Sequence, residues 1–176
     1  DPNCLMNPSL EVWERYVADF LRDPSRVLAF DVETPWRRKH ENDDDEVEQS
    51  EDISYNIDCI SFAFERDHGV TVPWAMPYVI GIAQMLQAAK TTIVWNRNYD
   101  RPRVMKALNM DLPITSCQDA LDCWHVCFNS LPRKLGFATA CLPSSFRLQA
   151  WKHLSSTAPA YYSVMDSIAL WRNWQD

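Results

Sequence analysis

The feature that most constrains the fold is a short apolar segment that ends in two acidic residues. Residues 26–32 (RVLAFDV) have the length and composition of a buried strand, and Asp31 and Glu33 lie at its end. Side chains alternate along a strand, so we expect both carboxylates on one face. Two neighbouring carboxylates repel each other unless a cation neutralises them, and their hard oxygen atoms suit Mg²⁺ or Mn²⁺. By itself the pair is weak evidence, since a solvated strand end would look the same.

The order of the predicted strands and helices indicates an α/β domain. Residues 10–21 carry apolar side chains at helical spacing, and Asp23-Pro24 ends that helix. Further strands are predicted at 57–64, 70–74, 91–95 and 114–117. Further helices are predicted at 77–89, 99–109, 118–128, 132–141 and 159–174. Three strands followed by alternating helices and strands predict a mixed five-stranded sheet flanked by helices, in a single domain over residues 1–176.

An acidic segment without periodicity interrupts this pattern at residues 41–52, and it predicts a solvated loop insertion. Removing its eight acidic residues from the formal net charge of −7 leaves +1 for the rest of the chain. Because the body is nearly neutral and has local basic groups, the negative overall charge does not exclude a nucleic-acid partner.

Membrane, secreted and zinc-ribbon proteins find no support in the sequence. No apolar run approaches the length of a membrane span and no signal-peptide pattern opens the chain, so we expect a cytoplasmic protein with no membrane partner. The six cysteines include no Cys-x-x-Cys pair, and we expect them to be small buried residues in a reducing compartment.

Two later segments each contribute a further acidic residue. Asn96 and Asp100 follow the strand at 91–95, around the start of a helix, and Tyr162 precedes Asp166 by four residues on one face of the last helix. Each also has an ordinary interpretation. Asn96 would cap its helix, Tyr162 would pack in the core and Asp166 would be solvated. The four acids Asp31, Glu33, Asp100 and Asp166 converge only if these segments meet at one edge of the sheet.

In this order, the three motifs resemble the DEDDy branch of the DnaQ-like 3′→5′ exonucleases. The matching segments are LAFDVETPW (28–36), VWNRNYDR (94–101) and YYSVMDSIAL (161–170). Segments 60–64, 69–74 and 119–142 are similar to the proofreading domain of phage- and bacterial-type family A DNA polymerases. The resemblance spans residues 25 to 175 and implies an RNase H-like fold. The acidic loop 41–52 departs from the family pattern. The resemblance implies a polymerase domain after the exonuclease, and residues 1–176 do not include one.

The resemblance also implies a mechanism, in which two Mg²⁺ or Mn²⁺ ions hydrolyse DNA phosphodiester bonds from the 3′ end during proofreading. It implies that Asp31 bridges both ions and that Glu33 and Asp166 complete the site of the ion that activates water. Asp100 would support the second ion. Tyr162 would orient the attacking water, because a phenol with a pKa near ~10 is a poor general base at neutral pH.

Substrate contacts are predicted around these residues. Thr34 would contact the terminal nucleotide through its backbone, and Trp36 would stack on a terminal base or pack in the core. Asn96 would contact substrate or hold Asp100. Five basic residues are candidate phosphate contacts, with a solvated helix surface as the default for the second and third of them. They are Arg97, Arg101, Arg103, Arg133 and Lys134.

The expected partners are a DNA 3′ end, single-stranded or frayed, and a polymerase domain in the same or the parent chain. The chain begins with Asp1 rather than Met, so we expect a fragment of a longer DNA polymerase. Two alternatives stay open. An RNA exonuclease of the RNase D type shares the four acids and the tyrosine, although LPRKLGF (131–137) favours the polymerase type. A catalytically silent DEDD module that binds nucleic acid or a partner is disfavoured by the intact acids.

Overall fold

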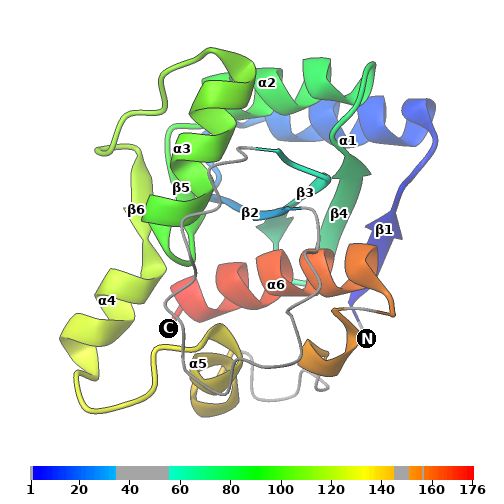
Figure 1. The fold of residues 1–176 in the computed structure, drawn as a ribbon. Helices are drawn as coiled ribbons and strands as arrows, with labels where there is room; N and C mark the ends of the chain where they lie inside the picture. Colours follow the sequence, from blue (N-terminus) through cyan, green and yellow to red (C-terminus); the bar gives the residue numbers. More distant parts are fainter. Residues whose placement is uncertain (1, 35–55, 145–150, 156) are drawn as a thin grey trace, which may run out of the picture.

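The computed structural model describes residues 2–34, 56–144, 151–155 and 157–176, and its centre is a six-stranded mixed sheet (Figure 1). β3 is antiparallel to both β2 and β4, and the other neighbouring pairs are parallel. Across the sheet the strands are ordered β1 (Asn3–Met6), β4 (His68–Pro73), β3 (Cys59–Glu65), β2 (Leu28–Glu33), β5 (Thr92–Val94) and β6 (Cys117–Asp119).

Helices cover both faces of this sheet. The pair α1 (Leu10–Arg22) and α2 (Tyr78–Ala88) lies over one face, and α6 (Pro159–Trp174) crosses the other (Figure 1). The remaining helices lie toward the β5–β6 end and around α6, and they are α3 (Arg97–Leu108), α4 (Ala120–Cys127), α5 (Leu135–Cys141) and the 3₁₀ turn η1 (Lys152–Leu154). No helix among the described residues is long and apolar enough to cross a membrane.

The predicted α/β fold with a mixed central sheet is confirmed, but the sheet has six strands in place of five. The additional strand, β1, has only four residues, and its first and last residues are exposed. It therefore shows no apolar alternation from which it could be predicted. The β3–β4 hairpin turns at Arg66 and Asp67, while His68 already belongs to β4. The expectation of buried cysteines is wrong for Cys123, Cys127 and Cys141, which are exposed. The acidic loop 41–52 lies outside the described residues.

The alternation of β2 separates the hydrophobic core from the acidic residues. Leu28, Phe30 and Val32 belong to the core cluster that packs under α1 and α2. Ala29 belongs to a second cluster, formed with residues of α6. Asp31 and Glu33 follow Ala29 at alternate positions, so they share its face of the sheet. The predicted geometry of this strand end, with both carboxylates on one face, is therefore what the structure shows.

Small residues on that face let α6 approach the sheet closely. A methyl group at Gly69 would lie 2.8 Å from Cγ2 of Val164 and 2.9 Å from Cγ1 of Ile168. The Thr71 hydroxyl donates a hydrogen bond of 2.8 Å to the carbonyl of Ala160. These contacts fix α6 on the sheet and with it the position of Asp166.

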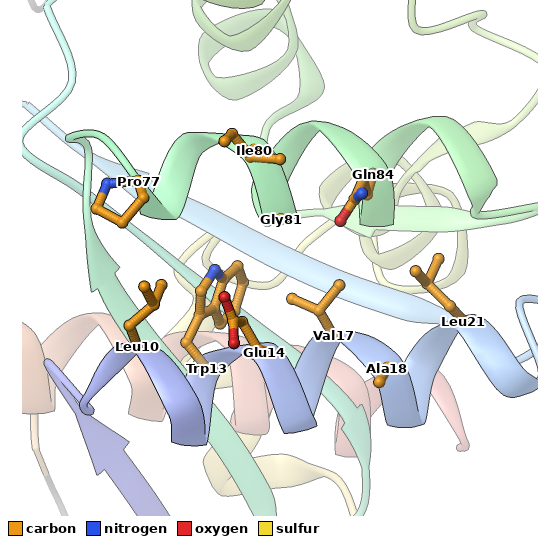
Figure 2. Close-up of a pocket in the computed structure, with 10 residues that line it drawn as sticks. All are labelled: Leu10, Trp13, Glu14, Val17, Ala18, Leu21, Pro77, Ile80, Gly81 and Gln84. Carbon is orange, nitrogen blue, oxygen red and sulfur yellow. The ribbon is translucent and has the colours of Figure 1, made fainter.

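On the opposite face, α1 and α2 pack just as closely around Gly81. A methyl group there would lie 2.6 Å from Nε1 of the buried Trp13, which points at α2 in Figure 2. Beside this contact the two helices leave a largely apolar groove of about 300 Å³. Among the ten described residues that line it, Glu14 is the only ionisable one. The described lining of this groove therefore offers no cluster of reactive groups.

Candidate metal centre

Three carboxylates from two elements meet at the carboxyl end of β2. Asp31 and Glu33 extend from β2 and Asp166 from the middle of α6, and each offers an oxygen atom within 4.8 Å of the others. Asp166 is 5% exposed, and the other two are half-buried. Ligand oxygens held at roughly 2.1–2.5 Å from one ion lie at most about 5 Å apart, so this spacing fits a single divalent cation. Carboxylate oxygens are the donors that Mg²⁺ and Mn²⁺ prefer.

The pKa of a neighbouring thiol reflects the negative charge of these carboxylates. Cys59 pairs with Glu33 across the β2–β3 ladder. Burial raises the pKa of the Cys59 thiol to about 12, with further contributions from the carboxylates of Glu33, Asp31 and Asp58. A bound cation would relieve the mutual repulsion of these carboxylates.

The fourth predicted acid, Asp100, is not one of the three clustered residues. It lies in the first turn of α3, is 2% exposed, and its Oδ1 accepts a hydrogen bond of 3.3 Å from the backbone N–H of Val32. Burial raises the pKa of Asp100 well above its usual range, and the charges of Glu33 and Asp119 raise it further. The Val32 N–H and Arg103 act in the opposite direction. Asp100 therefore interacts with the centre through Glu33 and the β2 backbone.

The start of α3 is held by Asp119 rather than by Asn96. Both Asp119 carboxylate oxygens accept backbone N–H groups, from Asn96 at 3.2 Å and from Arg97 at 2.8 Å. Asp119 also caps α4 by accepting from the N–H of Leu121 at 3.0 Å. Asn96 itself adopts a left-handed backbone with φ of 77°, and within the described residues its side chain makes no capping hydrogen bond. Asn96 thus holds the N-cap position of α3, but the predicted side-chain cap is wrong. Sequence reasoning also missed the capping role of Asp119, because it placed this residue inside a helix predicted at 118–128, whereas α4 begins at Ala120.

A cleft of about 600 Å³ opens beside the acids and is the natural place for a substrate. Asp31, Tyr162 and Asp166 line it together with the start of α5. Tyr162 and Asp166 share this cleft because they are four positions apart on α6 and so lie on one face of the helix. The remaining lining residues are Trp95, Lys134, Leu135, Gly136 and Phe137.

Two aromatic residues of this cleft were missed from the sequence. Trp95 directly follows β5, at the edge of the sheet where the acids lie, and that position was a usable signal. Phe137 belongs to the LPRKLGF segment, whose residues were recognised only as a family resemblance. Aromatic rings in such a cleft can stack on bases without reading their sequence.

A second hollow of about 470 Å³ lies beside Glu33 and includes Thr34. The Thr34 hydroxyl is 2.9 Å from the hydroxyl of Tyr99, so its side chain is held by α3. Asp58 and Cys59 also line this hollow. The acid cluster therefore borders two openings, with Asp31 and Asp166 lining one and Glu33 lining the other.

The predicted basic contacts are distributed differently from the expectation. Arg101 donates from Nε to the carbonyl of Leu112 and forms an ion pair with Asp111 at 3.6 Å. Its guanidinium therefore binds the segment that follows α3. Arg103 is only 7% exposed and its guanidinium carbon lies 3.6 Å above the Tyr99 ring, which contradicts a solvated surface position.

The other predicted contacts divide in the same way. Arg97 donates from Nη1 to the carbonyl of Cys117 at 3.1 Å, and the exposed Arg133 contacts His125. Among the residues described as lining the cleft, Lys134 is the cation. Trp36 lies outside the described residues.

Comparison with known proteins shows the fold and no more. No protein-family model and no curated protein matches the sequence. Among solved structures, the Aedes aegypti Nibbler EXO domain has a TM-score of 0.66 at 11% identity, over 98% of this chain and 85% of that one. Trypanosoma brucei RNase D has a TM-score of 0.68 at 9% identity, over 98% and 63%. The catalytic core of RRP6 from the same organism has 0.61 at 15%, over 98% and 45%. The chain shares the RNase H-like fold of these domains, as the sequence predicted.

Proposed function

We propose that this chain is a metal-dependent 3′→5′ exonuclease that hydrolyses phosphodiester bonds of a nucleic acid. The observation that carries this proposal is the group of three carboxylates within 4.8 Å, placed beside a cleft that also contains Tyr162. The fold relatives support it, because their names describe an EXO domain, an RNase D and the catalytic core of RRP6.

Asp31, Glu33 and Asp166 would hold a divalent cation, Mg²⁺ or Mn²⁺. When bound, such ions activate water and stabilise the negative charge that develops on the phosphate during hydrolysis. Asp100 interacts electrostatically with Glu33, and we propose that it supports the second of two ions. Its raised pKa is consistent with this role, because a nearby cation would favour the ionised form that burial disfavours.

Tyr162 would orient the attacking water. Its side chain lines the same cleft as Asp31 and Asp166, which is the proposed substrate site. A phenol that keeps its proton can donate to or accept from a water without taking a proton from it. We therefore assign to Tyr162 the positioning of the nucleophile, and to the bound metal its activation.

The cleft favours a single-stranded 3′ end. Trp95 and Phe137 provide rings for base stacking, and Lys134 provides a cation for a phosphate. Lys134 replaces Arg101 as the phosphate contact in this proposal, because the Arg101 guanidinium serves Leu112 and Asp111. Thr34 stays a proposed contact for the terminal nucleotide, from the hollow beside Glu33. A duplex would have to unpair near its end, which would favour mismatched termini.

DNA and RNA are the two candidate substrates. The sequence motifs favour DNA. On that basis the chain would proofread beside a polymerase domain, in a cytoplasmic enzyme. The fold relatives support an RNA substrate as well as the sequence motifs support DNA. They include RNase D proteins from Trypanosoma brucei and Escherichia coli, and the second is described as an exoribonuclease. An RNA 3′ exonuclease is therefore the second candidate function.

One digestion experiment tests the activity and separates these candidates. The purified chain is incubated with 5′-labelled single-stranded DNA or RNA of matched sequence, in EDTA, Mg²⁺ or Mn²⁺. We expect a ladder of products that shorten from the 3′ end, only with metal. Faster digestion of DNA would support the proofreading role, and faster digestion of RNA the second candidate. If neither is shortened with either metal, the exonuclease proposal is wrong and a silent binding module is favoured.

A further inference from the structure

A buried tryptophan contacts one of the three clustered carboxylates directly. Trp151, which immediately precedes η1, donates from its indole Nε1 to Oδ1 of Asp166 at 2.5 Å. Trp151 is 3% exposed and packs against Met165 and Ala169 of α6. Asp166 therefore contacts the buried indole and also lines the cleft.

The chemistry of the indole suits a supporting role. An indole N–H is a donor only and does not titrate, so it neither removes nor supplies a proton during a reaction. A carboxylate has two oxygens and about four acceptor positions, so this hydrogen bond leaves acceptor positions for a metal. Hydrogen bonds to an ionised carboxylate are short and about twice as strong as neutral ones, so the contact restrains the orientation of the carboxylate plane.

Backbone contacts alone do not orient the carboxylate of Asp166. The backbone of Asp31 and Glu33 is fixed by pairing with Ser61 and Cys59 of β3. Asp166 extends from a helix, whose backbone is fixed on the sheet by contacts such as that of Ser61 with Ser163, but whose side-chain torsions are not. The Trp151 N–H supplies a fixed partner for that side chain.

We propose that Trp151 is a positioning residue, which orients the Asp166 carboxylate so that it can bind a divalent cation together with Asp31 and Glu33. This inference rests on the proposed metal-dependent function. Hydrogen-bond partners behind metal ligands contribute about 10- to 100-fold to metal affinity or activity where this has been measured. Trp151 would then affect metal binding even in the absence of substrate.

The test replaces Trp151 by Phe, which keeps most of the ring and removes the N–H. The matched control is Trp171→Phe. Trp171 belongs to α6, and its indole N–H donates a hydrogen bond of 3.2 Å to the carbonyl of Val27. Val27 precedes β2, at the end of the strand away from the acids. Mn²⁺ binding is measured by calorimetry without substrate, and thermal unfolding is measured in EDTA.

We expect Trp151→Phe to weaken Mn²⁺ binding by about 10-fold, and Trp171→Phe to leave it within about 2-fold. A folded Trp151→Phe variant with wild-type Mn²⁺ affinity would overturn the proposal and leave Trp151 a packing residue. If the wild-type chain itself binds no Mn²⁺, the metal centre fails, and this proposal fails with it. Wild-type binding with no effect of Trp151→Phe refutes the positioning role alone.

A second measurement needs no folded Trp151 variant. The indole N–H resonances of the wild-type chain are followed by ¹H–¹⁵N NMR during a Mg²⁺ titration. We expect the Trp151 resonance to shift in a saturable way, because its acceptor changes charge environment, while the Trp171 resonance stays in place. A Trp151 resonance that does not move as Mg²⁺ saturates its site would contradict the proposal.

Discussion

The hydroxyl of Ser61 on β3 donates a hydrogen bond of 2.8 Å to the backbone carbonyl of Ser163 on α6, one helical turn before Asp166. The same hydroxyl lies 2.7 Å from that of Ser167, so the contact spans the residues that flank Asp166. Ser61 is also the cross-strand partner of Asp31. A single buried hydroxyl thus connects the two elements that supply the candidate metal ligands.

The close approach of α6 to the sheet predicts the effect of Gly69→Ala. The new methyl group would lie within 3 Å of Val164 and Ile168, so α6 must shift or the core must strain. Overpacking of this kind costs about 1–3 kcal/mol, which we expect as a lower free energy of unfolding in urea. We also expect weaker Mn²⁺ binding, because Asp166 moves with the helix.

Gly81→Ala is the matched control, since its methyl group would meet Trp13 on the opposite face of the sheet. It should lower stability and leave metal binding unchanged. Equal losses of Mn²⁺ affinity in both variants would show that α6 docking has no specific link to the metal centre.

The raised pKa of Asp100 predicts how stability depends on pH in the absence of metal. An acid whose folded pKa lies above its unfolded value of about 3.9 binds a proton more tightly when folded, so its contribution to stability falls as pH rises from that value toward the folded pKa. Asp100→Asn should remove this loss. In EDTA, the stability of the variant relative to wild type should therefore be greater at pH 8 than at pH 5, by urea denaturation.

The control for this experiment is Asp111→Asn, whose side chain is 75% exposed. It should leave the pH dependence of unfolding close to that of the wild type. If the free energy of unfolding of Asp100→Asn changed with pH in parallel with that of the wild type between pH 5 and pH 8, the raised pKa assigned to Asp100 would be contradicted.

The thiols predict a graded reactivity toward iodoacetamide. Burial raises the pKa of Cys4 to about 11, and burial with the nearby carboxylates raises that of Cys59 to about 12. Only thiolates react, so both cysteines should resist alkylation at pH 8, while the exposed Cys127 and Cys141 are modified. Peptide mass spectrometry of a time course measures this order, and alkylation of Cys59 as fast as that of Cys127 would contradict the buried, acidic environment assigned to it.

Tyr162→Phe should slow hydrolysis by up to about 100-fold, because the attacking water loses a positioning partner. Mn²⁺ affinity should change little, since the phenol is not assigned as a metal ligand. Tyr161→Phe is the control, because Tyr161 packs in the same cluster as Trp151 but is not among the residues described as lining the cleft. A large loss of metal affinity in Tyr162→Phe would refute the role proposed for this residue.

Local patterns predicted those features that depend on residues close together in the sequence. The alternation of β2 placed Asp31 and Glu33 on one face, and the predicted last helix has the bounds Pro159–Trp174 that the structure shows. The spacing of Tyr162 and Asp166 also follows from helical geometry alone. These relationships need no knowledge of tertiary packing.

The remaining features depend on contacts between distant segments, which no local pattern contains. Trp151 contacts Asp166 only because the residue before η1 packs against α6. Asp119 caps α3 from 22 residues away. The short edge strand β1 is defined by its pairing with β4 rather than by its own residues.

The central claim is that Asp31, Glu33 and Asp166 form a metal centre that hydrolyses nucleic acid from the 3′ end. The most direct measurement compares 3′-end shortening by the wild-type chain and by the Asp31→Ala plus Glu33→Ala variant, in Mg²⁺ and in Mn²⁺. Glu14→Ala, in the groove between α1 and α2, is the control for loss of an acidic residue. We expect the double variant to fold and to lose all digestion, while Glu14→Ala keeps it. A folded double variant that digests the 3′ end at the wild-type rate would contradict the account.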